Sequence, residues 1–181
     1  MTALACDDAL TDKNSTHSYL RTYEMLFRPV REAVANVLEI GVQRGGSIAM
    51  WHAYFPNATV TGVDVDPAPP LVGQLPRARL VRADAYSNAT VRTLGDRAYD
   101  IMIDDGPHTR ESMIFFISEY SKLLAPGGVM VVEDIQDVAW IPSLEAAVPD
   151  TFTHHTIDLR HLKNRYDDIL FMVRRPTVRP L

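Results

Sequence analysis

Acidic side chains and a histidine follow a short hydrophobic segment in the sequence YDIMIDDGPH. Asp104 and Asp105 end this segment, and His108 comes shortly after them. A second acidic pair, Glu133 and Asp134, ends another hydrophobic segment, GVMVVED. Carboxylates that gather in one place repel one another unless a cation neutralises them. Oxygen ligands favour a hard divalent ion such as Mg²⁺, with Mn²⁺ or Ca²⁺ as alternatives.

A glycine-rich turn follows an earlier hydrophobic segment, in the sequence NVLEIGVQRGGS. Glycines let the backbone approach a ligand closely, and the N-terminus of a following helix attracts anions. The spacing of Gly41 and Gly45 differs from the dinucleotide-binding pattern, and the Gly-Lys-Ser/Thr of a P-loop is absent. A plain strand-to-helix turn explains one glycine, but not three glycines preceded by Glu39. We therefore expect a nucleotide-type site at this turn, with Glu39, Gly41 and Gly45 among its residues.

Single acidic residues end the next two hydrophobic segments. Asp64 ends TVTGVD, where a carboxylate can accept hydrogen bonds from both hydroxyls of a ribose. Asp84 ends ARLVRAD, where it is placed to reach an adenine amino group. Each aspartate alone is more typical of a turn or a cap, but acidic residues after three successive segments favour a ligand site.

The elements that must position these residues are expected to alternate between strands and helices. Such alternation predicts a doubly wound, Rossmann-like α/β sheet of seven strands with helices on both faces. The strands are apolar throughout, which favours a parallel sheet, and ligands of such sheets bind beyond the carboxyl ends of the strands. Strands are expected at residues 36–42, 59–65, 78–84, 99–105, 128–135, 152–159 and 167–175, and helices at 18–34, 48–55, 109–124 and 144–148.

The bulk composition excludes several classes of protein. A chain of 181 residues suits one domain, and its net charge of −5 argues against a non-specific nucleic-acid binder. The single cysteine, Cys6, excludes an intramolecular disulfide and a zinc site built from cysteines. The N-terminus lacks a signal-peptide pattern, and no apolar run reaches the ~18–20 residues that span a bilayer. We therefore expect a cytoplasmic protein without membrane or nucleic-acid partners, and homo-oligomerisation is left open.

Several segments together resemble a known family. VLEIGVQRGGS, VTGVDVD, RADA and LLAPGGVMVVED resemble successive motifs of class I S-adenosylmethionine-dependent methyltransferases. TDKNSTHSY, DDGPH and EDI resemble a narrower group, the metal-dependent sugar O-methyltransferases of macrolide and other antibiotic tailoring. The resemblance implies a seven-stranded methyltransferase sheet and S-adenosylmethionine as cofactor. Its implied cofactor residues are Glu39, Gly41, Gln43, Gly45, Ser47, Asp64, Asp84, Ala85 and Asp104.

The resemblance also implies different roles for the residues of the acidic cluster. Asp105, Glu133 and Asp134 are the implied Mg²⁺ ligands, and His108 is the implied general base, with Asp105 also taking part in catalysis. Methyl transfer from a sulfonium is an in-line displacement, so the enzyme must align the acceptor oxygen with the methyl carbon. A bound metal increases the acidity of an oxygen, and imidazole titrates near pH ~6.5, which suits His108 to accept the proton.

The acceptor is expected to be a small molecule, and three functions remain open. The first is O-methylation of a sugar or glycosylated natural product, including a smaller glycoside or a nucleotide-linked sugar. The second is N-methylation, or O-methylation of a phenol or catechol, and in this case the carboxylates can bind the substrate directly. The third is a non-catalytic module that binds S-adenosylmethionine.

The polar segment before the first expected strand is harder to interpret. Residues 1–35 are expected to form an arm and a helix that cover the active site, and residues 36–181 the methyltransferase domain. Lys13 can meet the methionine carboxylate of the cofactor or a phosphate of the acceptor, or it can belong to an ordinary surface arm. The roles of His17 and Tyr19 in the same segment are also left open.

Overall fold

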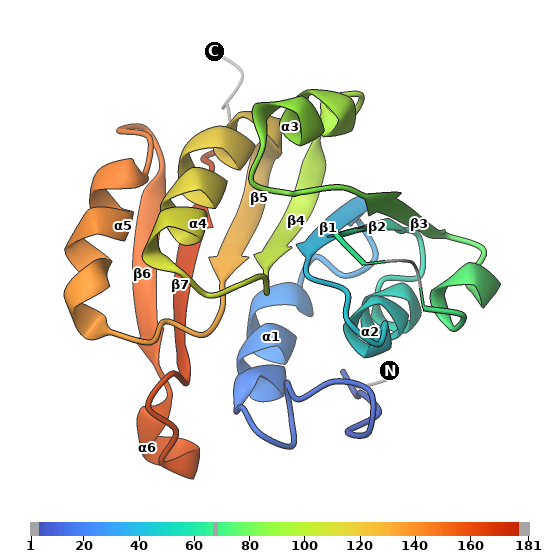
Figure 1. Cartoon of the computed structure of the whole chain (residues 1–181), viewed down its shortest axis with the longest axis horizontal. Coiled ribbons are helices and arrows are strands. Elements are labelled where there is room, and N and C mark those ends of the chain that lie inside the picture. The colour runs from blue at the N-terminus through green and yellow to red at the C-terminus, as the bar shows by residue number, and fades with distance from the viewer. Residues whose placement is uncertain (1–3, 67–68, 178–181) are drawn as a thin grey trace.

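The structure, a computed structural model, describes residues 4–66 and 69–177. The outer ends of the two expected regions, residues 1–3 and 178–181, lie outside the described residues. Seven strands form one sheet in the order β3-β2-β1-β4-β5-β7-β6 (Figure 1). Their bounds are β1 Asn36–Ile40, β2 Thr59–Asp64, β3 Ala78–Arg82, β4 Tyr99–Asp104, β5 Leu124–Val132, β6 Thr153–Asp158 and β7 Ile169–Arg174.

The expected α/β fold with seven strands is confirmed, but the sheet is mixed rather than wholly parallel. β1 to β5 pair in parallel, whereas β7 runs antiparallel to both β5 and β6. β6 and β7 are joined only by the short helix α6 (Arg160–Lys163) and its flanking loops. This connection is too short for parallel pairing of the two strands, because a parallel crossover needs about a dozen or more residues. β6 lies at the edge of the sheet, and its six residues are exposed or half-buried.

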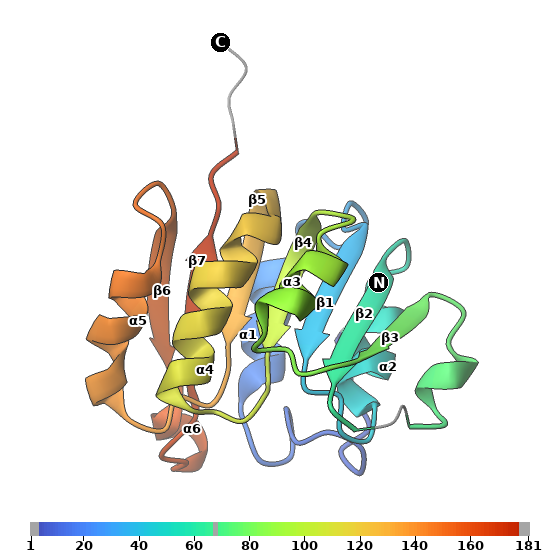
Figure 2. The same cartoon turned by 45° about the horizontal axis from the view of Figure 1, so that its top comes forward.

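Helices cover both faces of the sheet, as expected (Figure 2). α1 (Tyr19–Phe27) and α2 (Gly46–Tyr54) contribute to one hydrophobic core, in which Tyr23, Phe27, Trp51 and Phe55 form an aromatic cluster. α3 (Asn88–Leu94), α4 (Arg110–Phe115) and α5 (Ile141–Ala147) contribute to the core on the other face. Among the described residues, no helix combines the length and the apolar character required to cross a membrane.

Several helical segments differ from the sequence prediction. The helix expected over residues 18–34 ends at Phe27, because Pro29 lacks the backbone N–H that a longer helix would use. The helix expected over 109–124 is α4, followed by a π-helical segment, η2 (Phe116–Tyr120), and the 3₁₀ turn η3 (Ser121–Leu123). α3 was not predicted, although the Ser87 side chain accepts a hydrogen bond from the Thr90 N–H and caps it.

Candidate active site

The N-terminal segment crosses the sheet at the carboxyl ends of the central strands (Figure 2). Residues of both line a cavity of about 460 Å³. Nine of the predicted site residues line it: Gly41, Gln43, Ser47, Asp64, Asp84, Ala85, Asp105, His108 and Asp134. Tyr86, which the sequence did not single out, also lines it, as do Leu10, Thr11 and Asp12 of the N-terminal arm that was expected to cover the active site. Residues separated widely along the chain therefore share one cavity.

The glycine turn is packed tightly against the end of β4. Gly41 has a φ of +85°, and a Cβ at this position would lie 2.0 Å from the carbonyl oxygen of Asp105. Gly45, with a φ of +82°, directly precedes α2 and packs against Val72 and Pro69. Glycine is therefore required at residue 41 by the approach of two backbone segments, whatever ligand the turn binds.

Asp64 holds the same turn from the end of β2. Its Oδ2 accepts hydrogen bonds from the N–H groups of Val42 at 2.7 Å and Gln43 at 3.1 Å, and its Oδ1 accepts one from the Asp66 N–H at 3.0 Å. Burial alone would raise the pKa of Asp64, but these backbone N–H groups outweigh it and hold the pKa below its usual value. Asp64 is thus an ionised acceptor in the wall of the cavity.

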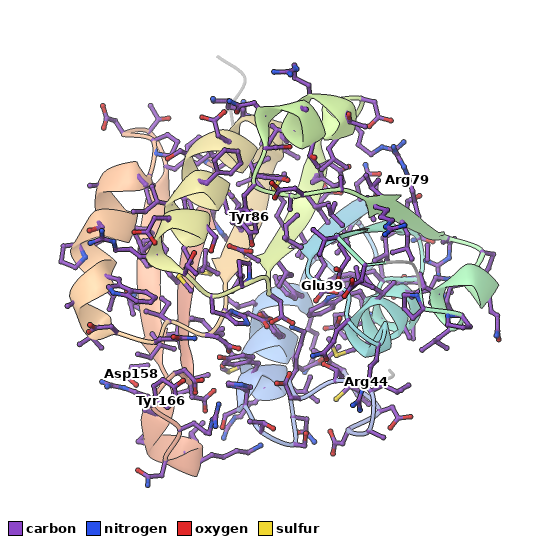
Figure 3. The ribbon with its side chains drawn as sticks, viewed as in Figure 1. Glu39, Arg44, Arg79, Tyr86, Asp158 and Tyr166 are labelled. Atoms are coloured by element: carbon purple, nitrogen blue, oxygen red, sulfur yellow. The ribbon has the colours of Figure 1, made fainter. Side chains whose placement is uncertain are left out.

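Two of the predicted cofactor residues, Glu39 and Asp104, lie beneath the cavity. Glu39 is fully buried and accepts hydrogen bonds from Ser47 Oγ at 2.7 Å and Trp51 Nε1 at 3.1 Å. Asp104 is also buried and accepts a hydrogen bond from the Tyr86 hydroxyl (Figure 3 labels Glu39 and Tyr86). Burial raises the pKa of each carboxyl group to about 7. Like Gly45, neither is among the described residues that line the cavity.

The register of β4 and β5 brings the two acidic pairs together. Asp104 is paired with Val132, so the residues that follow them, Asp105 and Glu133, end neighbouring strands. His108 Nε2 lies 3.7 Å from Asp105 Oδ1 and 3.5 Å from Asp134 Oδ2. His108 and Asp134 have φ angles of +53° and +57°, a backbone conformation that is unfavourable for these residues and common at functional sites.

Lys13 lies in the centre of this acidic cluster. Its fully buried Nζ donates hydrogen bonds to Asp105 Oδ2 at 2.7 Å and to Glu133 Oε2, and it lies 3.5 Å from Glu39 Oε1. Burial alone would lower the pKa of Lys13, but the three carboxylates outweigh it and raise the pKa well above its usual value. The alternative of an ordinary surface arm is therefore wrong for Lys13.

Two tyrosines of α1 reach the same cluster. Tyr19 donates to Asp134 Oδ1, and Tyr23, one helical turn later, donates to Glu133 Oε1. His17 Nδ1 lies 3.4 Å from Asp134 Oδ1. The sequence left the role of Tyr19 open and predicted for Tyr23 only that it lies in the helix expected over residues 18–34. The available signal was that buried tyrosine hydroxyls need polar partners.

The donor groups of the cluster fit a divalent cation. Asp105, His108 and Asp134 each offer a ligand atom, and these atoms lie within 4.8 Å of one another. The carboxylate oxygens of Asp105 and Asp134 suit Mg²⁺ or Mn²⁺, whereas an imidazole nitrogen such as that of His108 is a ligand more typical of Zn²⁺ or Fe²⁺. The third predicted carboxylate, Glu133, is adjacent, but its two oxygens accept hydrogen bonds from Lys13 and Tyr23.

Comparison with known proteins identifies the family. Residues 38–135, more than half of the chain, match the family described as "Methyltransferase domain". The chain belongs to this methyltransferase family. The methyltransferase is 38% identical over 149 residues to 8-demethyl-8-alpha-L-rhamnosyl tetracenomycin-C 2'-O-methyltransferase of Streptomyces olivaceus. This alignment covers 77% of this chain and 39% of the relative. It is also 30% identical over 133 residues to mycinamicin VI 2''-O-methyltransferase of Micromonospora griseorubida, in an alignment that covers 68% of this chain and 33% of that relative.

A solved structure supports the same relationship. MycE, a methyltransferase of mycinamycin biosynthesis in complex with Mg and SAH, superimposes with a TM-score of 0.63 at 29% identity. The alignment covers 71% of this methyltransferase and 34% of MycE. The chain therefore spans about a third to two-fifths of the length of these relatives. The family expected from the sequence motifs is confirmed.

Proposed function

We propose that the chain is an S-adenosylmethionine-dependent, divalent-metal-assisted O-methyltransferase that acts on a hydroxyl of a sugar or glycosylated natural product. One observation carries the proposal: the acidic residues Asp64 and Asp84 and the cluster of Asp105, His108 and Asp134 line the same cavity. The relatives named above are O-methyltransferases of glycosylated compounds, and MycE was solved with Mg and SAH.

The cofactor is proposed to occupy the part of the cavity formed by β1, β2 and β3. Asp64 is ionised and accepts hydrogen bonds, as a partner for ribose hydroxyls must, and Asp84 and Ala85 follow β3 on the same side. The volume of about 460 Å³ lies within the ~300–1,000 Å³ typical of small-molecule sites. Glu39, Gly45 and Asp104 are proposed to support this site by fixing the glycine turn and the end of β4.

The acceptor is proposed to bind beside the acidic cluster. Asp105, Glu133 and Asp134 would hold Mg²⁺, which when bound increases the acidity of an acceptor hydroxyl. His108 is the proposed general base, because its partly exposed side chain lines the cavity and its Nε2 lies near both Asp105 and Asp134. These two carboxylates stabilise the imidazolium that forms when His108 accepts the proton, so Asp105 serves both roles assigned to it.

The proposal is tested with labelled S-adenosylmethionine, Mg²⁺ and a panel of sugar nucleotides and glycosylated natural products. We expect methyl transfer that EDTA abolishes and Mg²⁺ restores. His108→Ala should lower turnover by about 10²–10⁴-fold while SAH affinity stays within a factor of three. His155→Ala, which changes an exposed histidine of β6, is the matched control and should retain activity.

The alternatives give different results in the same experiment. Activity that resists EDTA contradicts the metal role and favours an N- or phenolic O-methyltransferase whose carboxylates bind the substrate. Tight SAH binding without turnover on sugar, phenol or amine acceptors favours a non-catalytic module. Unchanged turnover in His108→Ala contradicts the assignment of the general base.

A further inference from the structure

Lys13 and the proposed metal ion require the same oxygen atoms. In the described structure each oxygen of Glu133 already accepts a hydrogen bond, Oε2 from Lys13 and Oε1 from Tyr23. Asp105 gives Oδ2 to Lys13 and presents Oδ1 toward His108. A divalent ion that binds through Asp105, Glu133 and Asp134 would lie beside the Lys13 ammonium group, and the repulsion between the two cations makes them compete for Glu133.

The ammonium group also explains how the acidic cluster is stable without an ion. Glu39 and Glu133 are almost completely inaccessible to solvent, and burying unpaired carboxylates is strongly unfavourable. Lys13 Nζ contacts both of them and Asp105, so one buried cation partly neutralises three acids. Lys13 thus supplies from within the chain part of the positive charge that a metal cation would otherwise bring to these acids.

We propose that Lys13 is the resident counter-cation of this cluster in the metal-free protein, and that a divalent ion binds by taking Glu133 from it. The inference rests on the proposed metal site and adds that a side chain of the protein competes with the ion for Glu133. When the ion takes Glu133, Lys13 retains Glu39, which is already 3.5 Å away, and shares Asp105 with a like charge. Ion binding thus weakens the contact that fixes residues 11–17 over the cavity.

A second lysine permits a matched control. Lys163 holds the same segment from outside, because its Nζ donates to the carbonyl oxygens of Asn14 and of His17, the latter at 2.7 Å. Lys163→Met therefore loosens the segment without removing the buried cation. Lys13→Met removes the cation from the cluster, and Lys13→Arg keeps a positive charge there.

The first test measures Mn²⁺ affinity by electron paramagnetic resonance, in the absence of acceptor. Lys13→Met should bind Mn²⁺ at least about tenfold more tightly than wild type, because the competing charge is gone. Lys163→Met should match wild type, and Lys13→Arg should bind no more tightly than wild type. Equal or weaker binding by Lys13→Met overturns the inference, whereas Mn²⁺ binding by none of the four proteins overturns the proposed metal site itself.

The second test uses the wild-type protein, so it decides the question even if Lys13→Met fails to fold. The N–H groups of Thr16 and His17 donate to the Asp12 carbonyl oxygen at 3.0 and 2.9 Å. Hydrogen exchange of these amides, read by mass spectrometry, should become faster when Mg²⁺ is added. Slower or unchanged exchange, in protein that binds the ion, would mean that Lys13 keeps Glu133 and overturns the inference.

Discussion

Carboxyl groups at successive strand ends differ in charge because their surroundings differ. Asp64 receives three backbone N–H groups and is ionised, whereas burial raises the pKa of Glu39 and of Asp104 to about 7. Sequence spacing placed all three at the edge of the sheet, but it could not separate the one that lines the cavity from the two beneath it. That distinction depends on Ser47, Trp51 and Tyr86, which approach only after folding.

Glu39→Gln should change how stability depends on pH. The pKa of Glu39 is about 7 in the folded chain and 4.5 ordinarily, so the folded state holds the proton more tightly. This contribution is complete below pH 4.5 and is lost as the pH rises through 7. Between pH 4.5 and 8, wild type should therefore lose about 3 kcal/mol more free energy of unfolding than Glu39→Gln.

Urea denaturation in EDTA at several pH values measures this difference. Glu32→Gln, which alters an exposed glutamate, should keep the wild-type pH dependence. Equal slopes for wild type and Glu39→Gln would show that Glu39 titrates normally in the folded protein.

At the scale of the elements, strand ends were predictable and the polar role of α1 was not. The hydrophobic runs that end in Asp64, Asp104 and Val132 place β2, β4 and β5 from the sequence alone, because buried parallel strands are apolar throughout. The antiparallel direction of β7 and the contacts of Tyr19 and Tyr23 depend on packing between distant segments. Periodicity reports which face of a helix is buried, but not which hydroxyl groups find carboxylates there.

Tyr23→Phe should destabilise the protein more than Tyr120→Phe, although both remove one buried hydroxyl. Tyr23 donates to the Glu133 carboxylate, whereas Tyr120 donates to the carbonyl oxygen of Ala85 at 2.6 Å. Hydrogen bonds to charged groups contribute about 1.5–3 kcal/mol and neutral ones about 0.5–1.5 kcal/mol. Urea denaturation at pH 8 compares the two variants, and an equal loss would mean that Glu133 is neutral or finds another donor.

The cavity belongs to the molecule as a whole. Its walls come from the N-terminal segment, the glycine turn and the ends of β2 to β5, which meet only in the complete sheet (Figure 1). The sequence predicted the strand-end residues, since parallel strands share a carboxyl edge. It placed residues 1–35 over the active site, but no periodicity identifies Leu10–Asp12 as the part of this arm that lines the cavity.

Cofactor binding should therefore stabilise the entire fold. At 100 times its dissociation constant, a ligand that binds only the folded state adds about 2.7 kcal/mol to the free energy of unfolding. For a chain of this size, that corresponds to a rise in Tm of roughly 5–10 °C.

Differential scanning fluorimetry with SAH measures the rise, and Asp64→Asn should abolish it, because Asp64 both holds the glycine turn and lines the cavity. Asp158→Asn, at the end of β6 beside Tyr166 and away from the cavity lining (Figure 3), should keep the full shift. If Asp64→Asn shows the wild-type shift, the cofactor binds elsewhere on the molecule.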